Sequence, residues 1–304
     1  MEASNSVINL KKVLNIFYSS KLLIVSITLI ISLSTLFLST LLINVYNSNA
    51  TLQVNESQGK SSSGMLGGYA DLAGMAGISL PKNSDDKGIL AVEIIRSRDF
   101  FSFLMEKYDL KLPIMASGGF DQSTGEIIYN KKIYDIGNSK WVRKASSPLK
   151  PEPNMLETHA KFIEDILSVG IFKKTGFIDI SINHHSPIFA NELLEIVIFE
   201  LNETARKRDL KDAKNAISFL NSQLSKYSLA GNKNIIFKLM EQQLHTQMMA
   251  EVEEGYLLKV IDSPSKPVKK IWPSRIVIVI LGTFFGFAFS LLYALLRYYY
   301  KINV

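Results

Sequence analysis

The sequence predicts an α+β membrane protein, in which two transmembrane helices flank a periplasmic α/β base that carries a long extended helix. Three observations lead to this prediction. Each end of the chain holds a long uncharged apolar run, Leu22–Ile43 and Ile276–Leu296. The 232 residues between these runs mix patterns with the periods of strands and helices. One helical pattern, from Pro187 to Tyr227, is long enough to project beyond a small base.

The two apolar runs account for a mean hydropathy of +0.14, which is high for a soluble chain. They contain 22 and 21 residues. At ~1.5 Å per residue, each spans the ~30 Å hydrocarbon core of a bilayer. A cleaved signal peptide is the alternative for the first run. That run exceeds the roughly 7–15 apolar residues of a signal peptide, and Ser48-Asn49-Ala50 is a poor cleavage site. A retained anchor is therefore predicted.

The flanking charges predict the orientation. Lys11, Lys12 and Lys21 precede the first run, whereas residues 44–55 carry no charge, so the N-terminus is expected to be cytoplasmic. Around the second run the balance is reversed, with four cations before it and two after it: Lys266, Lys269, Lys270 and Arg275, then Arg297 and Lys301. The rule weakens for long translocated segments. An even number of spans therefore predicts a cytoplasmic C-terminus.

Short elements are expected between the first run and the long helix. A strand at Val45–Asn55 and a flexible segment at Gly59–Ser79 come first. Leu90, Ile94 and Ile95 have helical spacing, and a helix is predicted at Arg98–Tyr108, stopped by Pro113. A polar loop is expected at Asp121–Pro153.

A second group of elements follows that loop. Asn154 and Glu157 have the spacing of a capping box, and the helix that they begin is expected to bury Phe162, Ile163, Ile166 and Leu167. Phe177–Ile182 alternates with period two, which predicts a half-buried strand after a turn at Lys174–Gly176. A last strand is expected at Tyr256–Ile261.

Ser186 and Pro187 predict the start of the long helix, as N-cap and first helical residue. Its later part carries a coiled-coil-like seam at 3-4-3-4 spacing: Leu210, Ala213, Ile217, Leu220 and Leu224. The chain's own returning helix, expected at Asn234–Glu254, or a neighbouring copy can cover this seam. Part of it is expected to form an oligomer contact. Pro264, Pro267 and Pro273 predict a stiff stalk into the second membrane helix.

Both membrane helices carry small or hydroxylated residues on one face. On the second helix they recur every four residues: Gly282, Gly286, Ser290 and Ala294. On the first helix they follow a 4-3-4 spacing: Thr28, Ser32, Thr35 and Ser39. Small residues at such spacing let helix backbones approach closely in a membrane. The pattern therefore predicts close packing of these transmembrane faces.

No pattern predicts catalysis. The sequence lacks P-loop, GxGxxG, GxSxG and HExxH motifs, and without cysteine it has neither disulfides nor thiolate ligands. His184 and His185 should point to opposite faces of a strand end and are expected at the surface.

The net charge of +6 is spread along the chain, so no nucleic-acid partner is expected. We therefore expect no catalytic residue, no cofactor and no metal. Tyr298–Tyr300 favours aromatic anchoring over phosphorylation.

Several segments together resemble one protein family. They are the two spans, GGYADLAGMAGI after the first strand, FIDISINHHSPIFANELLEIV at the start of the long helix, AKNAISFLNSQL along it, and the proline-rich stalk. In this order they resemble the Wzz-type polysaccharide co-polymerases, the chain-length determinants of bacterial O-antigen and related glycans. WVRKASSPLKPEP resembles an insertion in one branch of that family. With eight residues after the last span, a fused tyrosine kinase is not expected.

The resemblance implies a non-enzymatic regulator that sets the chain length of a lipid-linked surface polysaccharide. It implies a homo-oligomeric ring in the bacterial inner membrane, acting with a separate membrane polymerase that extends a glycan on undecaprenyl pyrophosphate. The expected organisation is cytoplasmic tails at 1–21 and 297–304, transmembrane helices at 22–43 and 276–296, and a periplasmic domain at 44–275. Two alternatives stay open. One is a capsule or exopolysaccharide export adaptor. The other is a two-span periplasmic sensor, although tails of 21 and 8 residues are too short to fold as a signalling module.

Overall fold

The computed structural model describes residues 17–55, 84–172, 174–224 and 230–302. The chain divides into two compact units. Residues 1–45 and 270–304 form a membrane-helix unit, and residues 46–269 form an α/β unit. The expected flexible segment at Gly59–Ser79 lies outside the described residues.

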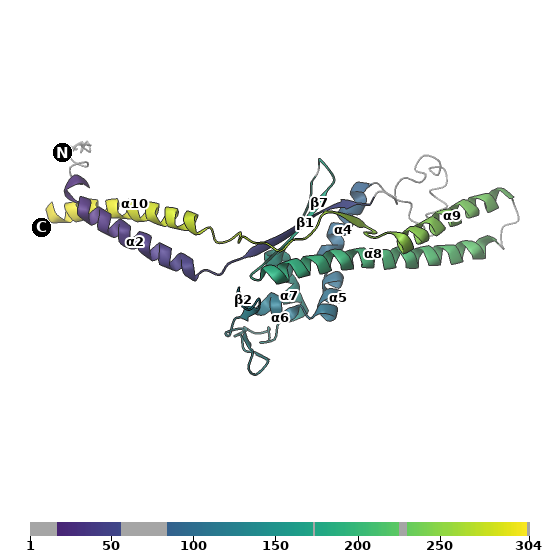
Figure 1. The fold of residues 1–304 in the computed structure, drawn as a ribbon, viewed down its shortest axis with the longest axis horizontal. Coiled ribbons are helices and arrows are strands. Elements are labelled where there is room, and N and C mark those ends of the chain that lie inside the picture. The colour runs from purple at the N-terminus through teal and green to yellow at the C-terminus, as the bar shows by residue number, and fades with distance from the viewer. Residues whose placement is uncertain (1–16, 56–83, 173, 225–229, 303–304) are drawn as a thin grey trace, which may run out of the picture. The chain divides into compact units, whose positions relative to one another are not determined.

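Two long helices make up the membrane-helix unit. Helix α2 (Lys21–Leu41) and helix α10 (Arg275–Ile302) pack along each other, drawn in purple and yellow in Figure 1. Both are long and apolar enough to cross a membrane. Beyond the end of α2 and before the start of α10, the Val45 N–H donates to the Trp272 carbonyl at 2.9 Å, and the Ile271 N–H donates to the Val45 carbonyl at 2.9 Å. The two segments next to the helices are thereby joined.

A four-stranded antiparallel sheet organises the α/β unit, in the order β6 (Leu167–Ile171), β7 (Ile178–His184), β1 (Tyr46–Val54) and β8 (Leu258–Asp262). The central strand β1 is the first element of the unit and its neighbour β8 is the last. Because they run antiparallel, the chain enters and leaves the unit at the same end of these two strands.

The sheet has one apolar face and one polar face. Ala50 and Leu52 of β1, like Ile178 and Ile180 of β7, are fully buried and alternate with half-buried polar residues. This confirms the period-two pattern. On the polar face, the Thr51 hydroxyl donates to Asp179 across the strands at 2.9 Å. The apolar face is covered by α4 (Ser84–Arg96) and by the first half of α8 (Pro187–Leu224).

Helix α5 (Arg98–Tyr108) has the predicted bounds, but its stop was predicted wrongly. The helix ends at Asp109, whose backbone is left-handed with φ of 47°. Pro113 instead lies inside a further short helix, α6 (Lys111–Ala116). It occupies the first turn of α6, where an N–H has no acceptor within the helix, so a proline fits there without losing a hydrogen bond.

Two small hairpins occupy the first part of the expected polar loop and the four residues before it. Strand β2 (Ser117–Phe120) pairs with β3 (Ile127–Tyr129), and β4 (Tyr134–Asp135) pairs with β5 (Lys140–Trp141). The short strands were not predicted, because each is too brief for a period-two pattern to appear.

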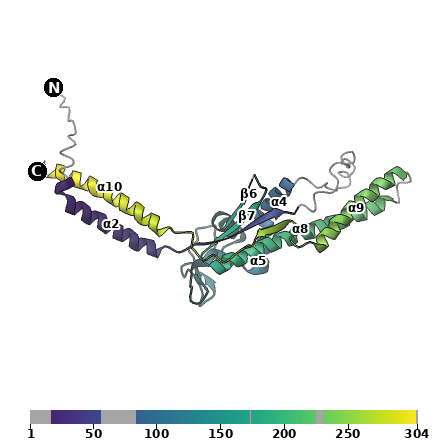
Figure 2. The same ribbon diagram turned by 45° about the horizontal axis from the view of Figure 1, so that its top comes forward.

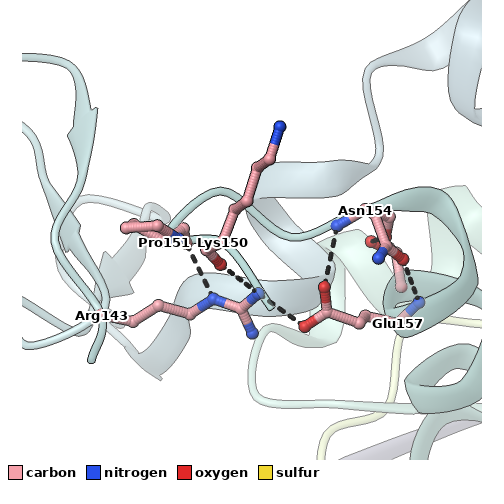
Figure 3. A network of polar contacts seen from close by, with 6 residues as sticks. Arg143, Lys150, Pro151, Asn154 and Glu157 are labelled. Atoms are coloured by element: carbon pink, nitrogen blue, oxygen red, sulfur yellow. Dashed lines mark hydrogen bonds and ion pairs between the residues drawn. The ribbon is translucent and has the colours of Figure 1, made fainter. Parts of the chain in front are cut away.

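Arg143 fastens the end of this loop, as Figure 3 shows. Its guanidinium donates to the carbonyls of Pro151 and Lys150 at 2.8 and 2.9 Å, and it pairs with the Glu157 carboxylate. Glu157 also accepts from the Asn154 N–H, while the Asn154 side chain accepts from the Glu157 N–H. The capping box at the start of α7 (Met155–Lys161) is thereby confirmed.

The expected apolar face after this box is only partly helical. Residues Phe162–Ile166 form a single turn of π-helix, and Phe162 and Ile166 are buried. Leu167 was assigned to the helix wrongly, because it is the first residue of β6. The expected last strand is also displaced, since β8 begins at Leu258, after the left-handed Gly255 with φ of 70°.

Helices α8 and α9 (Ala230–Val252) form an antiparallel hairpin, whose two arms lie side by side in Figures 1 and 2. The Ser186 hydroxyl accepts from the Phe189 N–H at 3.2 Å, which confirms the predicted cap of α8. Leu220 packs against Ile236 and Leu239 of α9 in a small core of its own. The described part of α8 ends at Leu224, and the expected end at Tyr227 lies outside the described residues.

His184 is buried, so its assignment to the surface was wrong. Only 4% of the residue is exposed. Its Nδ1 accepts from the Ser186 N–H at 3.0 Å, and its Nε2–H donates to the Pro113 carbonyl at 3.1 Å. Because one partner can only donate and the other can only accept, the neutral ring satisfies both. Burial lowers the pKa of His184 to about 4. The imidazole thereby links β7, α6 and the start of α8.

This burial predicts a pH-dependent stability. The unfolded-state pKa of 6.5 exceeds the folded-state value of about 4, so the stabilising contribution is complete above pH 6.5 and is lost as the pH falls towards 4. The loss should be on the order of 3 kcal/mol of unfolding free energy. Thermal unfolding of the full chain in detergent, followed by circular dichroism, measures it.

The variant His184→Gln should be less stable than the wild type at neutral pH and should lose less stability on acidification. His245→Gln, at an exposed position of α9, is the control and should retain the wild-type pH dependence. Equal pH dependence in both variants would contradict the role assigned to His184.

Candidate functional site

The small residues of α10 lie against α2 with no room for a larger side chain. A Cβ at Gly282 would lie 2.4 Å from the Thr35 Cγ2, and a Cβ at Gly286 would lie 2.9 Å from the Ile31 Cγ2. Ser290 and Ala294 continue the same face and are buried. The glycines therefore set the distance between the two helices. Thr35 lies in the contact predicted from the sequence, whereas Ile31 was not predicted because it resembles every other aliphatic residue of the run.

Hydroxyl groups connect the same two faces. The Thr283 hydroxyl donates to the Ser32 hydroxyl at 3.0 Å, and the Thr28 and Ser290 hydroxyls are 3.3 Å apart. Interhelical hydrogen bonds such as these contribute about 0.6–2 kcal/mol in membranes. Ser39, the last of the predicted residues on α2, is buried and donates to the Leu36 carbonyl within its own helix. Thr283 was missed, although a hydroxyl residue in an apolar run was a visible signal.

The predicted seam of α8 is mostly occupied within the chain. Ala213 and Leu220 are buried, Ile217 and Leu224 are half-buried, and Leu210 packs against the main core of the α/β unit. Helix α9 covers Leu220 and Leu224. The contribution of this seam to an oligomer stays a prediction.

The opposite situation holds on α9, which carries an exposed apolar stripe. Phe237, Leu244, Met248 and Val252 follow one another at a 7-4-4 spacing and are 55%, 46%, 65% and 80% exposed. This spacing places them on one face of the helix. Sequence reasoning missed the stripe, although its periodicity was readable in the returning helix. Exposed apolar surface of this kind is typical of protein contacts.

Two buried polar residues of α8 hold neighbouring elements. The Asn202 side-chain oxygen accepts from the N–H groups of Leu257 and Leu258, both at 2.9 Å, and its amide donates to the Leu258 carbonyl at 3.2 Å. Asn202 thereby ties α8 to the start of β8. Neither Asn202 nor Glu200 was selected from the sequence, because a polar residue on a long helix usually faces water.

Glu200 joins α8 to α5 and is 1% exposed. The Lys107 ammonium and the Tyr108 hydroxyl both donate to its Oε1. Burial by itself raises the pKa of the Glu200 carboxyl, but the hydrogen bonds from Lys107 and Tyr108 outweigh it and hold the pKa below its ordinary value. The carboxylate therefore stays charged and serves as a link between helices.

The stalk prolines lie in both units. Pro264 and Pro267 are half-buried in the α/β unit, where the neighbouring Ser265 carbonyl accepts from the Ser48 hydroxyl at 3.0 Å. Pro273 is buried in the membrane-helix unit. Among the described residues, no group of three or more His, Asp or Glu side chains could hold a metal ion.

The helix contact predicts that Gly282→Leu separates α2 from α10. The chain has no cysteine, so Ser32→Cys with Thr283→Cys should give an intrachain disulfide where the two hydroxyls now meet. Adding Gly282→Leu should lower the disulfide yield several-fold, because the new side chain would overlap Thr35. Mass spectrometry of isolated membranes measures the yield. Ala288→Leu, at an exposed position of α10, is the control, and an equal yield with both substitutions would contradict the contact.

Comparisons with known proteins give one family match. No curated protein sequence matches this chain. It is similar to a full-length bacterial polysaccharide co-polymerase, with a TM-score of 0.48 and 11% identity over 95% of this chain and 97% of the other. It is also similar to a fragment of WzzB, the polysaccharide co-polymerase from Salmonella Typhimurium, with a TM-score of 0.33 and 15% identity over 75% of this chain and 100% of the other. Residues 6–107 match the family model of the chain length determinant protein, Wzz. This match covers about a third of the chain and agrees there with the resemblance found in the sequence.

Proposed function

We propose that this protein is a non-enzymatic co-polymerase that sets the chain length of a lipid-linked, O-antigen-like surface polysaccharide in the bacterial inner membrane. The Wzz family match over residues 6–107 carries this proposal. The matched region includes α2 and β1, the first membrane helix and the central strand of the sheet. The proposal assigns bond formation to a separate membrane polymerase and only regulation to this chain.

The architecture supports a membrane-anchored regulator. In the proposed arrangement, residues 22–43 and 276–296 cross the membrane, residues 44–275 are periplasmic, and the tails at 1–21 and 297–304 are cytoplasmic. The two candidate membrane helices pack tightly through Gly282 and Gly286. Between them stands a folded unit whose entry and exit strands are neighbours.

The proposed partners are further copies of this chain in a ring, the polymerase, and the undecaprenyl-linked glycan. The exposed stripe of α9 supports self-association, because an unpartnered apolar face of this length is costly to leave in water. Helix α9 covers Leu220 and Leu224 of the α8 seam, whereas its own stripe is exposed. No cofactor enters the proposal.

The central test is deletion of the protein. If it regulates length, glycan synthesis should continue, because the polymerase forms the bonds, but the modal cluster of long chains should give way to a smooth decay. Gel electrophoresis of the surface polysaccharide measures the distribution, and complementation should restore the mode. Complete loss of polymer would contradict the proposal and favour an export adaptor. An unchanged distribution would favour the sensor alternative.

The proposed topology is tested with reporter fusions. A reporter at either terminus should show cytoplasmic activity. A reporter inserted at Asn138, an exposed residue in the turn between β4 and β5, should show periplasmic activity. A periplasmic C-terminus would contradict the two-span arrangement.

A further inference from the structure

Two cationic side chains converge on one neutral group at one end of the membrane-helix unit. The Lys270 Nζ donates to the Asn44 Oδ1 at 3.0 Å, and the Arg275 Nη2 approaches the same oxygen at 3.4 Å. Asn44 follows the apolar run of α2, and Arg275 is the first residue of α10. The amide oxygen of Asn44 thus accepts hydrogen bonds from two positively charged side chains.

Within the described residues of this unit, no carboxylate compensates these charges. Neither Asp nor Glu occurs in its described residues, 17–45 and 270–302. Desolvation and the charge of Arg275 both lower the pKa of Lys270. An amide dipole neutralises neither charge, so the local potential stays positive. The pair is therefore suited to an anion.

Backbone hydrogen bonds hold the segment of Lys270 beside that of Asn44. The hydrogen bonds between Val45 and Trp272, and from Ile271 to Val45, join the segments that carry Asn44 and Lys270. Trp272 and Ile271 are 50% and 54% exposed beside the pair. Tryptophan at the end of a membrane helix is typical of the headgroup level of a bilayer. In the proposed arrangement the cations thus lie at the depth of lipid phosphates.

The positive charges before α10 also need an explanation. With residues 44–275 in the periplasm, Lys270 and Arg275 oppose the usual preference for cations on the cytoplasmic side. A binding role accounts for their position. An arginine can donate two parallel hydrogen bonds to phosphate oxygens, and a lysine adds a compact charge.

We propose that Lys270 and Arg275 bind the phosphate or pyrophosphate group of a membrane lipid, beside Asn44. Two kinds of lipid carry such a group: an anionic phospholipid and a polyprenyl pyrophosphate carrier. Both sources use the membrane topology proposed above, and the carrier source also rests on the proposed role in glycan synthesis. Bound lipid phosphate would replace Asn44 as the shared acceptor and would hold the lipid next to the junction of the two membrane helices.

Native mass spectrometry of the full chain in detergent tests this site. The probes are phosphatidylglycerol, undecaprenyl pyrophosphate and, without a phosphate, undecaprenol. Lys270→Gln with Arg275→Gln should weaken binding of phosphate-bearing lipid about tenfold or more, because two charge-assisted contacts are lost. Lys259→Gln with Arg297→Gln removes the same charge at exposed positions elsewhere and should leave binding unchanged. Lys270→Arg with Arg275→Lys should retain most of the binding.

The outcomes separate the two sources. Selective loss of undecaprenyl pyrophosphate binding supports the carrier, and loss of both phosphate lipids supports a general headgroup site. Equal binding in the Gln variant and its control, or undecaprenol binding as tight as that of its pyrophosphate, would overturn the proposal. The measurement uses no glycan synthesis. Its failure therefore leaves the deletion test of the proposed function standing, and the reverse also holds.

Discussion

The antiparallel pairing of β1 with β8 is the constraint on which the rest of the structure depends. β1 directly follows the first membrane helix, and β8 precedes the segment that leads to the second. Their register brings Leu52 opposite Val260, some 200 residues later in the chain. The chain therefore enters and leaves the α/β unit at the same end of two paired strands. This arrangement is compatible with the contact between α2 and α10.

Buried polar groups position the long helix on this sheet. Hydrophobic burial is not directional, so buried polar contacts add specificity to the position of α8 on the strands. Asn202 accepts hydrogen bonds from two N–H groups at the start of β8. Glu200 links α8 to α5, and His184 links the start of α8 to α6. An unpaired buried polar group would cost roughly 1–3 kcal/mol. These three residues therefore specify one register for the base of the hairpin.

Function in such a protein depends on surfaces. The α/β unit supplies a rigid base, the α8–α9 hairpin carries an exposed apolar stripe, and the paired membrane helices end in two cations at the proposed headgroup level. Each feature suits contact with another molecule: a further copy of the chain, the polymerase, or a lipid. Under the proposed function, these surfaces would position the partners, and a separate polymerase would form the bonds.

Local signals in the sequence by themselves determined the helices and their caps. Two apolar runs predicted α2 and α10, Asn154 and Glu157 predicted the capping box, and Ser186 predicted the start of α8. Small and hydroxylated residues on both apolar runs predicted close packing of their faces. Each of these signals involves residues close in sequence: a capping box spans about one helical turn, and a strand pattern repeats every two residues. Tertiary structure alone decided the burial of His184, the place of Pro113 inside α6, the roles of Asn202 and Glu200, the occupant of the α8 seam, and the partners Ile31 and Thr283. Except for Pro113, whose place follows from the local helix break at Asp109, the outcome depends on another segment of the chain. The local pattern carries no information about which segment that is.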